Sequence, residues 1–108
     1  MNIFALIKQQ VKAMESIIKS LCEYLNVQYE DVMRKTNNHN ISMQRNYIYY
    51  ILHYDFKFSI NQIGKCFKRS GREINYRISE MKYRIEYFKD YRAKYVDLYD
   101  YALNHIGF

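Results

Sequence analysis

The sequence predicts an all-α protein of about five helices, with a central helix-turn-helix between long N- and C-terminal helices. Three observations carry this prediction. The 108 residues include no proline and three glycines, which favours helices. Apolar side chains recur at intervals of three, four and seven residues, as on one face of a helix. No stretch alternates apolar and polar residues for long, as a half-buried strand would.

The first half of the chain is expected to form two helices followed by a loop. The N-terminal helix covers residues 2–25, and Asn26 is a suitable end for it. A short helix follows over residues 28–36, with acidic side chains in its first turn and basic ones in its last, as the helix dipole prefers. The five polar residues 36–40 have turn chemistry and are predicted to be a loop.

Two further helices have recognisable caps. Ser42 is expected to cap a third helix, which fades near residues 55–57. Ser59 is expected to cap a short fourth helix, and Gln62, three residues on, completes a capping box. Gly64 lies within this helix and lacks a side chain, so another helix can approach it closely.

The last predicted helix is long. Residues 68–71 form a tight turn in which Gly71 can adopt a positive φ, and the helix starts near Arg72. It is expected to run for about thirty residues, or about 45 Å at 1.5 Å per residue. Its last part extends beyond the predicted helical cluster and needs a partner. The partner is either the N-terminal helix or a second copy of the chain. Because the last helix has more apolar length than the domain can cover, a homodimer through the terminal helices is favoured, although the N-terminal helix stays the open alternative.

The chain has the length of one domain, since about 100 residues bury enough apolar surface to fold alone. No internal repeat, low-complexity tract or linker divides it. We therefore treat residues 1–108 as one helical domain. It comprises an N-terminal helix at 1–26, a helix-turn-helix core at 27–82, and an extension of the last helix at 83–108.

Composition and spacing argue against several classes of protein. Cys22 and Cys66 are too few for a disulfide scaffold. Lys8, Lys12 and Lys19 interrupt the first helix before a membrane span of about 20 apolar residues is reached. The N-terminal apolar run is shorter than that of a signal peptide, so a cytoplasmic protein is expected. No zinc-ligand spacing or nucleophile–base set is visible. We therefore expect that the protein is not an enzyme, binds no cofactor, metal ion or small-molecule substrate, and does not associate with a membrane.

Positive charge is concentrated in the second half of the chain. Residues 1–40 carry five basic and four acidic side chains, whereas residues 41–108 carry twelve and seven. Between residues 65 and 84, seven basic side chains face two acidic ones. A focused positive field attracts polyanions, of which nucleic acid is the commonest, although a solvated helix face is the simpler alternative.

The predicted turn and the helix after it form a candidate DNA-binding surface. In a helix-turn-helix, the first residues of the second helix reach base edges in the major groove, where Arg, Asn and Glu pair with guanine, adenine and cytosine. The predicted major-groove residues are Ser70, Arg72, Glu73, Asn75, Tyr76 and Arg77. Phosphate contacts, which set the register and supply most of the affinity, are predicted at Lys65, Lys68 and Arg69.

Other interpretations of these residues stay open. The arginines at positions 69, 72 and 77 can form a plain solvated surface, and Tyr76 can lie at a helix interface. At the level of the whole chain, one rival is a protein-interaction or dimerisation module on the same scaffold. Another is binding of RNA or single-stranded nucleic acid, which the aromatic content favours.

Residues 41–81 resemble the C-terminal DNA-binding domain of the chromosomal replication initiator DnaA, a helical fold related to the Trp repressor. The resemblance rests on DVM at 31–33, ISMQR at 41–45 and, most specifically, SINQIGKCF at 59–67. It implies double-stranded DNA binding. Arg45 stands where the family has an arginine, which implies a phosphate contact and adds Arg45 to the predicted phosphate-binding residues; pairing with Asp31 or another carboxylate is the open alternative. Arg69 can match the arginine of the family's signature.

The sequence also departs from the family at the positions that read bases. The family's Asp-His-Thr run has no counterpart in residues 70–73, and the loop before Ile41 lacks the family's arginines, although it keeps Lys35. No P-loop motif for an ATPase is present. We therefore expect a DNA target different from the usual initiator site.

Overall fold

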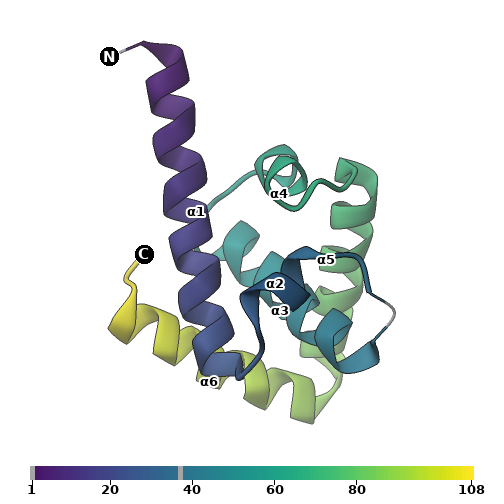
Figure 1. The fold of residues 1–108 in the computed structure, drawn as a ribbon. Helices are drawn as coiled ribbons and strands as arrows, with labels where there is room; N and C mark the ends of the chain where they lie inside the picture. The colour runs from purple at the N-terminus through teal and green to yellow at the C-terminus, as the bar shows by residue number, and fades with distance from the viewer. Residues whose placement is uncertain (1, 37) are drawn as a thin grey trace.

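The computed structural model of the chain describes every residue except Met1 and Asn37. Within the described residues it forms six helices and no strand, which confirms the predicted all-α class (Figure 1). The helices are α1 (Ile3–Leu25), α2 (Tyr29–Met33), α3 (His39–Tyr54), α4 (Ile60–Phe67), α5 (Gly71–Tyr87) and α6 (Lys89–His105). This is one helix more than expected, because the long last helix is divided in two.

The boundaries of α1 follow from asparagines at its two ends. The side chain of Asn2 accepts a hydrogen bond from the backbone N–H of Ala5 at 2.8 Å. Asn26 adopts the left-handed conformation, with φ 57°, and its N–H bonds to the carbonyls of the last turn. Asparagine tolerates this conformation better than most residues, so the predicted end at Asn26 is confirmed.

The start of α3 corrects two expectations. Asn38, not Ser42, is the N-cap, and the helix begins at His39. The Ser42 hydroxyl instead donates to the carbonyl of Thr36 at 3.5 Å and ties the connection to α3. The polar loop is therefore shorter than predicted, and its residue Asn37 lies outside the described part of the chain.

Helix α4 begins as the sequence predicts. The Ser59 hydroxyl accepts from the N–H of Gln62 at 3.1 Å, and the Gln62 side chain accepts from the N–H of Ser59 at 2.8 Å. This reciprocal pair is the expected capping box, and it satisfies two N–H groups that the first helical turn leaves without partners.

The turn between α4 and α5 differs in detail from the prediction. Lys68, not Gly71, takes the left-handed conformation, with φ 57°, and Gly71 is the first residue of α5. The N–H of Arg69 bonds to the carbonyl of Gly64 at 2.9 Å. A Cβ on Gly64 would lie 2.7 Å from the carbonyl oxygen of Arg69. Gly64 is thus the glycine that the turn requires, and the close approach predicted there is made by the turn backbone.

The expectation of one unbroken helix after Arg72 is wrong. Phe88 is extended, with φ −121° and ψ 119°, and separates α5 from α6. The Arg92 guanidinium donates to the carbonyl of Ile85 at 3.2 Å and to that of Glu86 at 2.6 Å, so it caps the end of α5. Helix α6 then folds back across the end of the molecule and packs against α1 (Figure 1). Of the two expected partners for the last segment, the structure shows the N-terminal helix.

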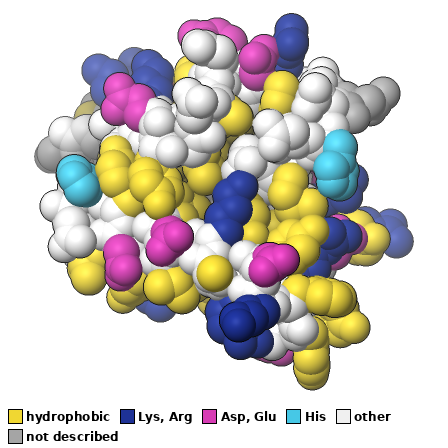
Figure 2. Space-filling model, turned by 90° about the horizontal axis from the view of Figure 1, so that it is seen from below, with side chains coloured by type: hydrophobic (Ala, Val, Ile, Leu, Met, Phe, Trp, Pro, Cys, Tyr) yellow, Lys and Arg dark blue, Asp and Glu magenta, His cyan; other side chains and the backbone are white. Residues whose placement is uncertain are grey.

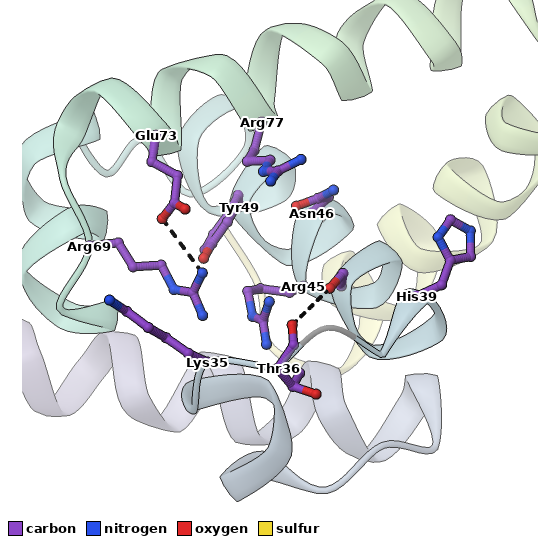
Figure 3. Close-up of a pocket in the computed structure, with 10 residues that line it drawn as sticks. Lys35, Thr36, His39, Arg45, Asn46, Tyr49, Arg69, Glu73 and Arg77 are labelled. Atoms are coloured by element: carbon purple, nitrogen blue, oxygen red, sulfur yellow. Dashed lines mark hydrogen bonds and ion pairs between the residues drawn. The ribbon is translucent and has the colours of Figure 1, made fainter.

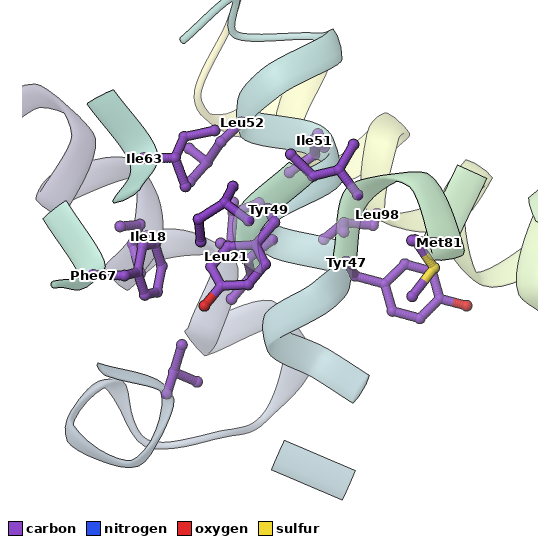
Figure 4. Close-up of a cluster of buried hydrophobic side chains, with 14 of the residues drawn as sticks. Ile18, Leu21, Tyr47, Tyr49, Ile51, Leu52, Ile63, Phe67, Met81 and Leu98 are labelled. Carbon is purple, nitrogen blue, oxygen red and sulfur yellow. The ribbon is translucent and has the colours of Figure 1, made fainter. Parts of the chain in front are cut away.

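All six helices contribute to one hydrophobic core (Figure 4). Its fully buried members, each with at most 1% of its surface exposed, include Ile18, Leu21, Val32, Tyr47, Tyr49, Ile51, Ile63, Ile74, Met81 and Leu98. Burying one such side chain stabilises the fold by about 1.5–3 kcal/mol. The core therefore fixes α4 and α5 against α3 and holds the turn between them at the surface. No helix in the described part of the chain is long and apolar enough to cross a membrane.

Candidate nucleic-acid interface

Helix α5 projects its N-terminal end at the edge of the molecule, on the side away from α1 and α6 (Figure 1). Ser70 caps it by accepting a hydrogen bond from the N–H of Glu73 at 3.1 Å. A buried stripe anchors the helix to the core; its members are Ile74, Ile78, Met81 and Ile85. The intervening positions consequently face solvent, as the sequence predicts.

The exposed positions in the first two turns of α5 are the predicted base-reading residues. Arg72, Asn75, Tyr76 and Arg77 are all exposed, and Tyr76 has 60% of its surface accessible. The Arg77 guanidinium lies 5.5 Å from the centre of the Tyr76 ring, within the range of a cation–π contact. Tyr76 is therefore part of the exposed surface and not of a helix interface.

Two lysines flank this helix end. Lys65 lies on α4 and Lys68 in the turn, and both are exposed. The first backbone N–H groups of a helix carry a partial positive charge, so cations beside them strengthen the attraction for phosphate. The turn thus presents positive charge next to the tip of α5.

Arg45 lies inside the molecule, unlike the lysines. It has 4% of its surface exposed, and its guanidinium donates to three backbone carbonyls. The acceptors are Val32 at 2.7 Å, Arg34 at 2.9 Å and Asp31 at 3.4 Å. Burial lowers the pKa of Arg45, and the positive charge of Arg69 lowers it further. Arg45 therefore holds the end of α2 through carbonyls, whereas the carboxylate of Asp31 pairs with Arg34 at 2.9 Å.

Arg69 is also largely covered, with 10% of its side chain exposed. Its guanidinium donates to the carbonyl of Arg34 at 3.2 Å and pairs with the Glu73 carboxylate at 3.5 Å. Arg45 and Arg69 thus share one carbonyl acceptor. These two predicted phosphate-binding arginines connect α3 and the turn before α5 to the end of α2 and the segment after it.

These arginines border a cavity of about 620 Å³ that sequence reasoning missed (Figure 3). Arg77 and Glu73 line it from α5. The other lining residues, which were not predicted as site residues, are Lys35, Thr36, His39, Ser42, Asn46 and Tyr49. A sequence signal for part of this set exists, because Lys35 directly precedes the predicted polar loop and Tyr49 follows Arg45 by one helical turn.

The α6 face of the molecule has a different character. Figure 2 views the molecule from below, the side on which α6 lies in Figure 1, and shows hydrophobic, acidic and basic side chains interspersed. Helix α6 carries three Lys or Arg and three Asp. Positive charge is therefore concentrated around α4, the turn and α5, and not over the whole surface.

Two helices joined by a tight turn, with the second presenting an exposed polar tip, define a helix-turn-helix DNA-binding domain. Residues 14–73 match the family described as the bacterial dnaA protein helix-turn-helix. Since the match covers more than half of the chain, the chain belongs to this family. A search of curated proteins finds no match. The family match ends at Glu73, in the first turn of α5.

Proposed function

We propose that this chain binds double-stranded DNA by placing the tip of α5 in the major groove, at a sequence other than the usual initiator site. The observation that carries the proposal is the exposure of Arg72, Asn75, Tyr76 and Arg77 at the start of a helix held by a helix-turn-helix. In this motif those positions reach base edges.

The proposed contacts follow from side-chain chemistry. Arginine pairs with guanine, asparagine with adenine, and glutamate accepts from the amino group of cytosine. Arg72, Asn75 and Glu73 are the proposed readers of these bases. Lys65 and Lys68, exposed beside them, are proposed to contact phosphate and to fix the register of the helix on the duplex.

Two observations support a different target sequence. The residues at the start of α5 are Gly71-Arg72-Glu73, where the family carries its Asp-His-Thr run. The remaining exposed side chains of α5 lie beyond residue 73, outside the region that matches the family. The proposed reading residues are therefore this chain's own, on a scaffold that it shares with its family.

A fluorescence-anisotropy titration with a random-sequence duplex tests this proposal. The variant Arg72→Ala/Arg77→Ala is compared with Lys12→Ala/Lys89→Ala, which removes two exposed positive charges from α1 and α6. The first variant is expected to weaken binding by at least about tenfold, because positive charge at the tip of α5 attracts duplex DNA of any sequence, and the control to bind nearly as the wild type does. Equal binding by both variants, or preference for a single-stranded competitor, would contradict the proposal.

A second candidate function is self-association, which one observation favours. The first half of α1 exposes apolar side chains, with Ile3 67%, Phe4 74%, Ile7 48% and Val11 41% accessible. Exposed apolar patches of this kind mark interaction sites. We propose that two chains form a homodimer through this half of α1. Sedimentation equilibrium is expected to give twice the 13.3 kDa chain mass and to return to one chain mass in Ile7→Glu.

A further inference from the structure

We propose that the cavity between α3, α5 and the segment after α2 is a binding site for one tetrahedral phosphate group. The geometry that points to it is that the side chains of Arg45, Arg69, Arg77 and Lys35 all line one polar hollow (Figure 3). Within the described residues that line the cavity, Glu73 is the one carboxylate. Positive charge therefore exceeds negative charge inside it.

Two buried donors in this cavity have no hydrogen-bond partner among the described residues. They are the hydroxyl of Tyr49, whose residue is 1% exposed, and the Nε of Arg69. The Tyr49 hydroxyl points toward the guanidinium of Arg69 in Figure 3. A buried polar group without a partner costs about 1–3 kcal/mol, so two in one cavity indicate a missing acceptor.

The electrostatics of the cavity also favour an anion. Burial raises the pKa of Tyr49 to about 12, although the charges of Arg69 and Arg45 oppose the shift, so its hydroxyl remains a donor at neutral pH. The neighbouring positive charges of Arg69 and Arg77 contribute to lowering the pKa of Arg45, after burial itself. An anion placed between these groups would relieve that repulsion.

A tetrahedral oxyanion suits this donor set better than a flat carboxylate does. The donors belong to side chains on α3, on the turn before α5, on α5 and on the segment after α2, so they approach from different directions. A phosphate group has several oxygens that accept charge-assisted hydrogen bonds from such directions. The cavity, at about 620 Å³, also has room for the molecule that carries the phosphate.

The phosphate has two possible sources, the backbone of a DNA duplex and a free phosphate. The first source rests on the proposed function, because Arg77 belongs to both the cavity and the DNA surface. The second source is independent of it. The two sources share their chemistry at the site and differ in what removing the Tyr49 hydroxyl does to duplex binding.

The test is a titration of the full chain with inorganic phosphate. Binding is monitored through the backbone amide chemical shifts of the cavity residues in NMR spectra. Sodium chloride at matched ionic strength is the reference. Tyr49→Phe keeps the ring, which packs edge-on against Phe67 with 4.8 Å between ring centres, and removes only the unpartnered hydroxyl. We expect saturable binding by the wild type and about tenfold weaker binding by Tyr49→Phe.

Two further variants sharpen this test. Tyr83→Phe removes a hydroxyl from an exposed tyrosine of α5 outside the cavity and should leave the phosphate affinity unchanged. Glu73→Gln removes the carboxylate that pairs with Arg69 and should raise the affinity by about threefold. Phosphate that acts no differently from chloride, or equal affinity in Tyr49→Phe and the wild type, would overturn the proposal.

A parallel duplex titration identifies the source. If Tyr49→Phe weakens both phosphate and duplex binding, the cavity takes a phosphate of the DNA backbone. If it weakens phosphate binding alone, the ligand is a free phosphate. If the wild type binds no duplex at all, the proposed function fails, while the phosphate titration still decides whether the cavity is an anion site.

Discussion

Two regions of the molecule use charged and aromatic side chains in different ways. One is the α4–α5 corner, formed by α4, the turn and α5 (residues 60–87), and the other is the α1–α6 layer, formed by the two terminal helices. The stretch from residue 65 to 84, which lies within the corner, has seven basic and two acidic side chains, whereas α6 has three of each. In the layer, aromatic rings pack on one another, as Tyr24 and Tyr101 do with 4.6 Å between ring centres. In the corner, Tyr76 is exposed beside Arg77. The unbalanced charge, and not the high tyrosine content, distinguishes the candidate interface.

A related contrast exists between a buried arginine of α3 that holds the fold together and an arginine of α5 that faces outward. Arg45→Ala removes three hydrogen bonds to carbonyls around the end of α2 and should lower the free energy of unfolding by about 3 kcal/mol. Arg72→Ala, at an exposed position, should change it by no more than about 0.5 kcal/mol. Urea denaturation followed by circular dichroism measures both. Equal stability losses would erase the distinction.

The two glycines beside the α4–α5 turn are expected to differ in their tolerance of a methyl group, which Gly71 accepts and Gly64 does not. Gly64→Ala places a Cβ 2.7 Å from the backbone oxygen of Arg69, and the shift that this forces should cost about 2 kcal/mol of unfolding free energy. In Gly71→Ala the Cβ lies 3.2 Å from the flexible side chain of Asn61, so the cost should be below about 0.5 kcal/mol. Thermal denaturation compares the two variants. A neutral Gly64→Ala would show that the close packing of α4 on the turn is not required.

At the junction between α5 and α6, a substitution is expected to lower stability without changing the affinity for DNA. Arg92→Ala removes the cap from the last carbonyls of α5 and should cost about 1 kcal/mol of unfolding free energy. Because the cap lies at the far end of α5 from its tip, the duplex affinity should equal that of the neighbouring variant Lys89→Ala. Anisotropy and urea denaturation of the same samples check this. A selective loss of affinity in Arg92→Ala would mean that the layer contributes to binding.

The smallest expected effect concerns a contact between α3 and the layer. Tyr95 of α6 donates its hydroxyl to the Asp55 carboxylate at 2.5 Å. Burial raises the pKa of Asp55 above its ordinary value of 3.8, although this hydrogen bond and Lys57 oppose the shift. Between the two pKa values the folded protein binds more protons than the unfolded chain, so this contribution to stability is present at lower pH and falls as the pH rises.

Urea denaturation from pH 3.5 to 6 tests that effect. The wild type should lose stability relative to Asp55→Asn as the pH rises from about 3.8, since the variant lacks the titrating group. The exposed substitution Asp97→Asn on α6 serves as the control. A wild type that gains stability relative to Asp55→Asn as the pH rises would contradict the assigned direction of the shift.

Local chemistry explains which parts of the fold the sequence could predict. The capping box at Ser59, the end of α1 at Asn26 and the buried stripe of α5 depend on neighbouring residues, so spacing and residue type reveal them. The break at Phe88 depends on Arg92, whose donation to the carbonyls of α5 forms only after the chain has turned back. Neither proline nor glycine marks that position.

The candidate site was predictable to a similar extent. The exposed tip of α5 follows from helical periodicity, because its residues alternate with the buried stripe. The cavity does not follow from periodicity, because it joins Lys35, Tyr49 and Arg69 from three separate segments. The burial of Arg45 likewise depends on the carbonyls at the end of α2, whose position only the folded chain fixes.

The salt dependence of duplex binding tests the central claim most directly, because contacts to phosphate release counterions. If about six phosphates are neutralised, log K should fall against log salt concentration with a slope near −5, from about −0.9 per contact. A wild-type chain that binds duplex DNA with that slope supports the account. A slope near zero, or no binding at low salt, would contradict it.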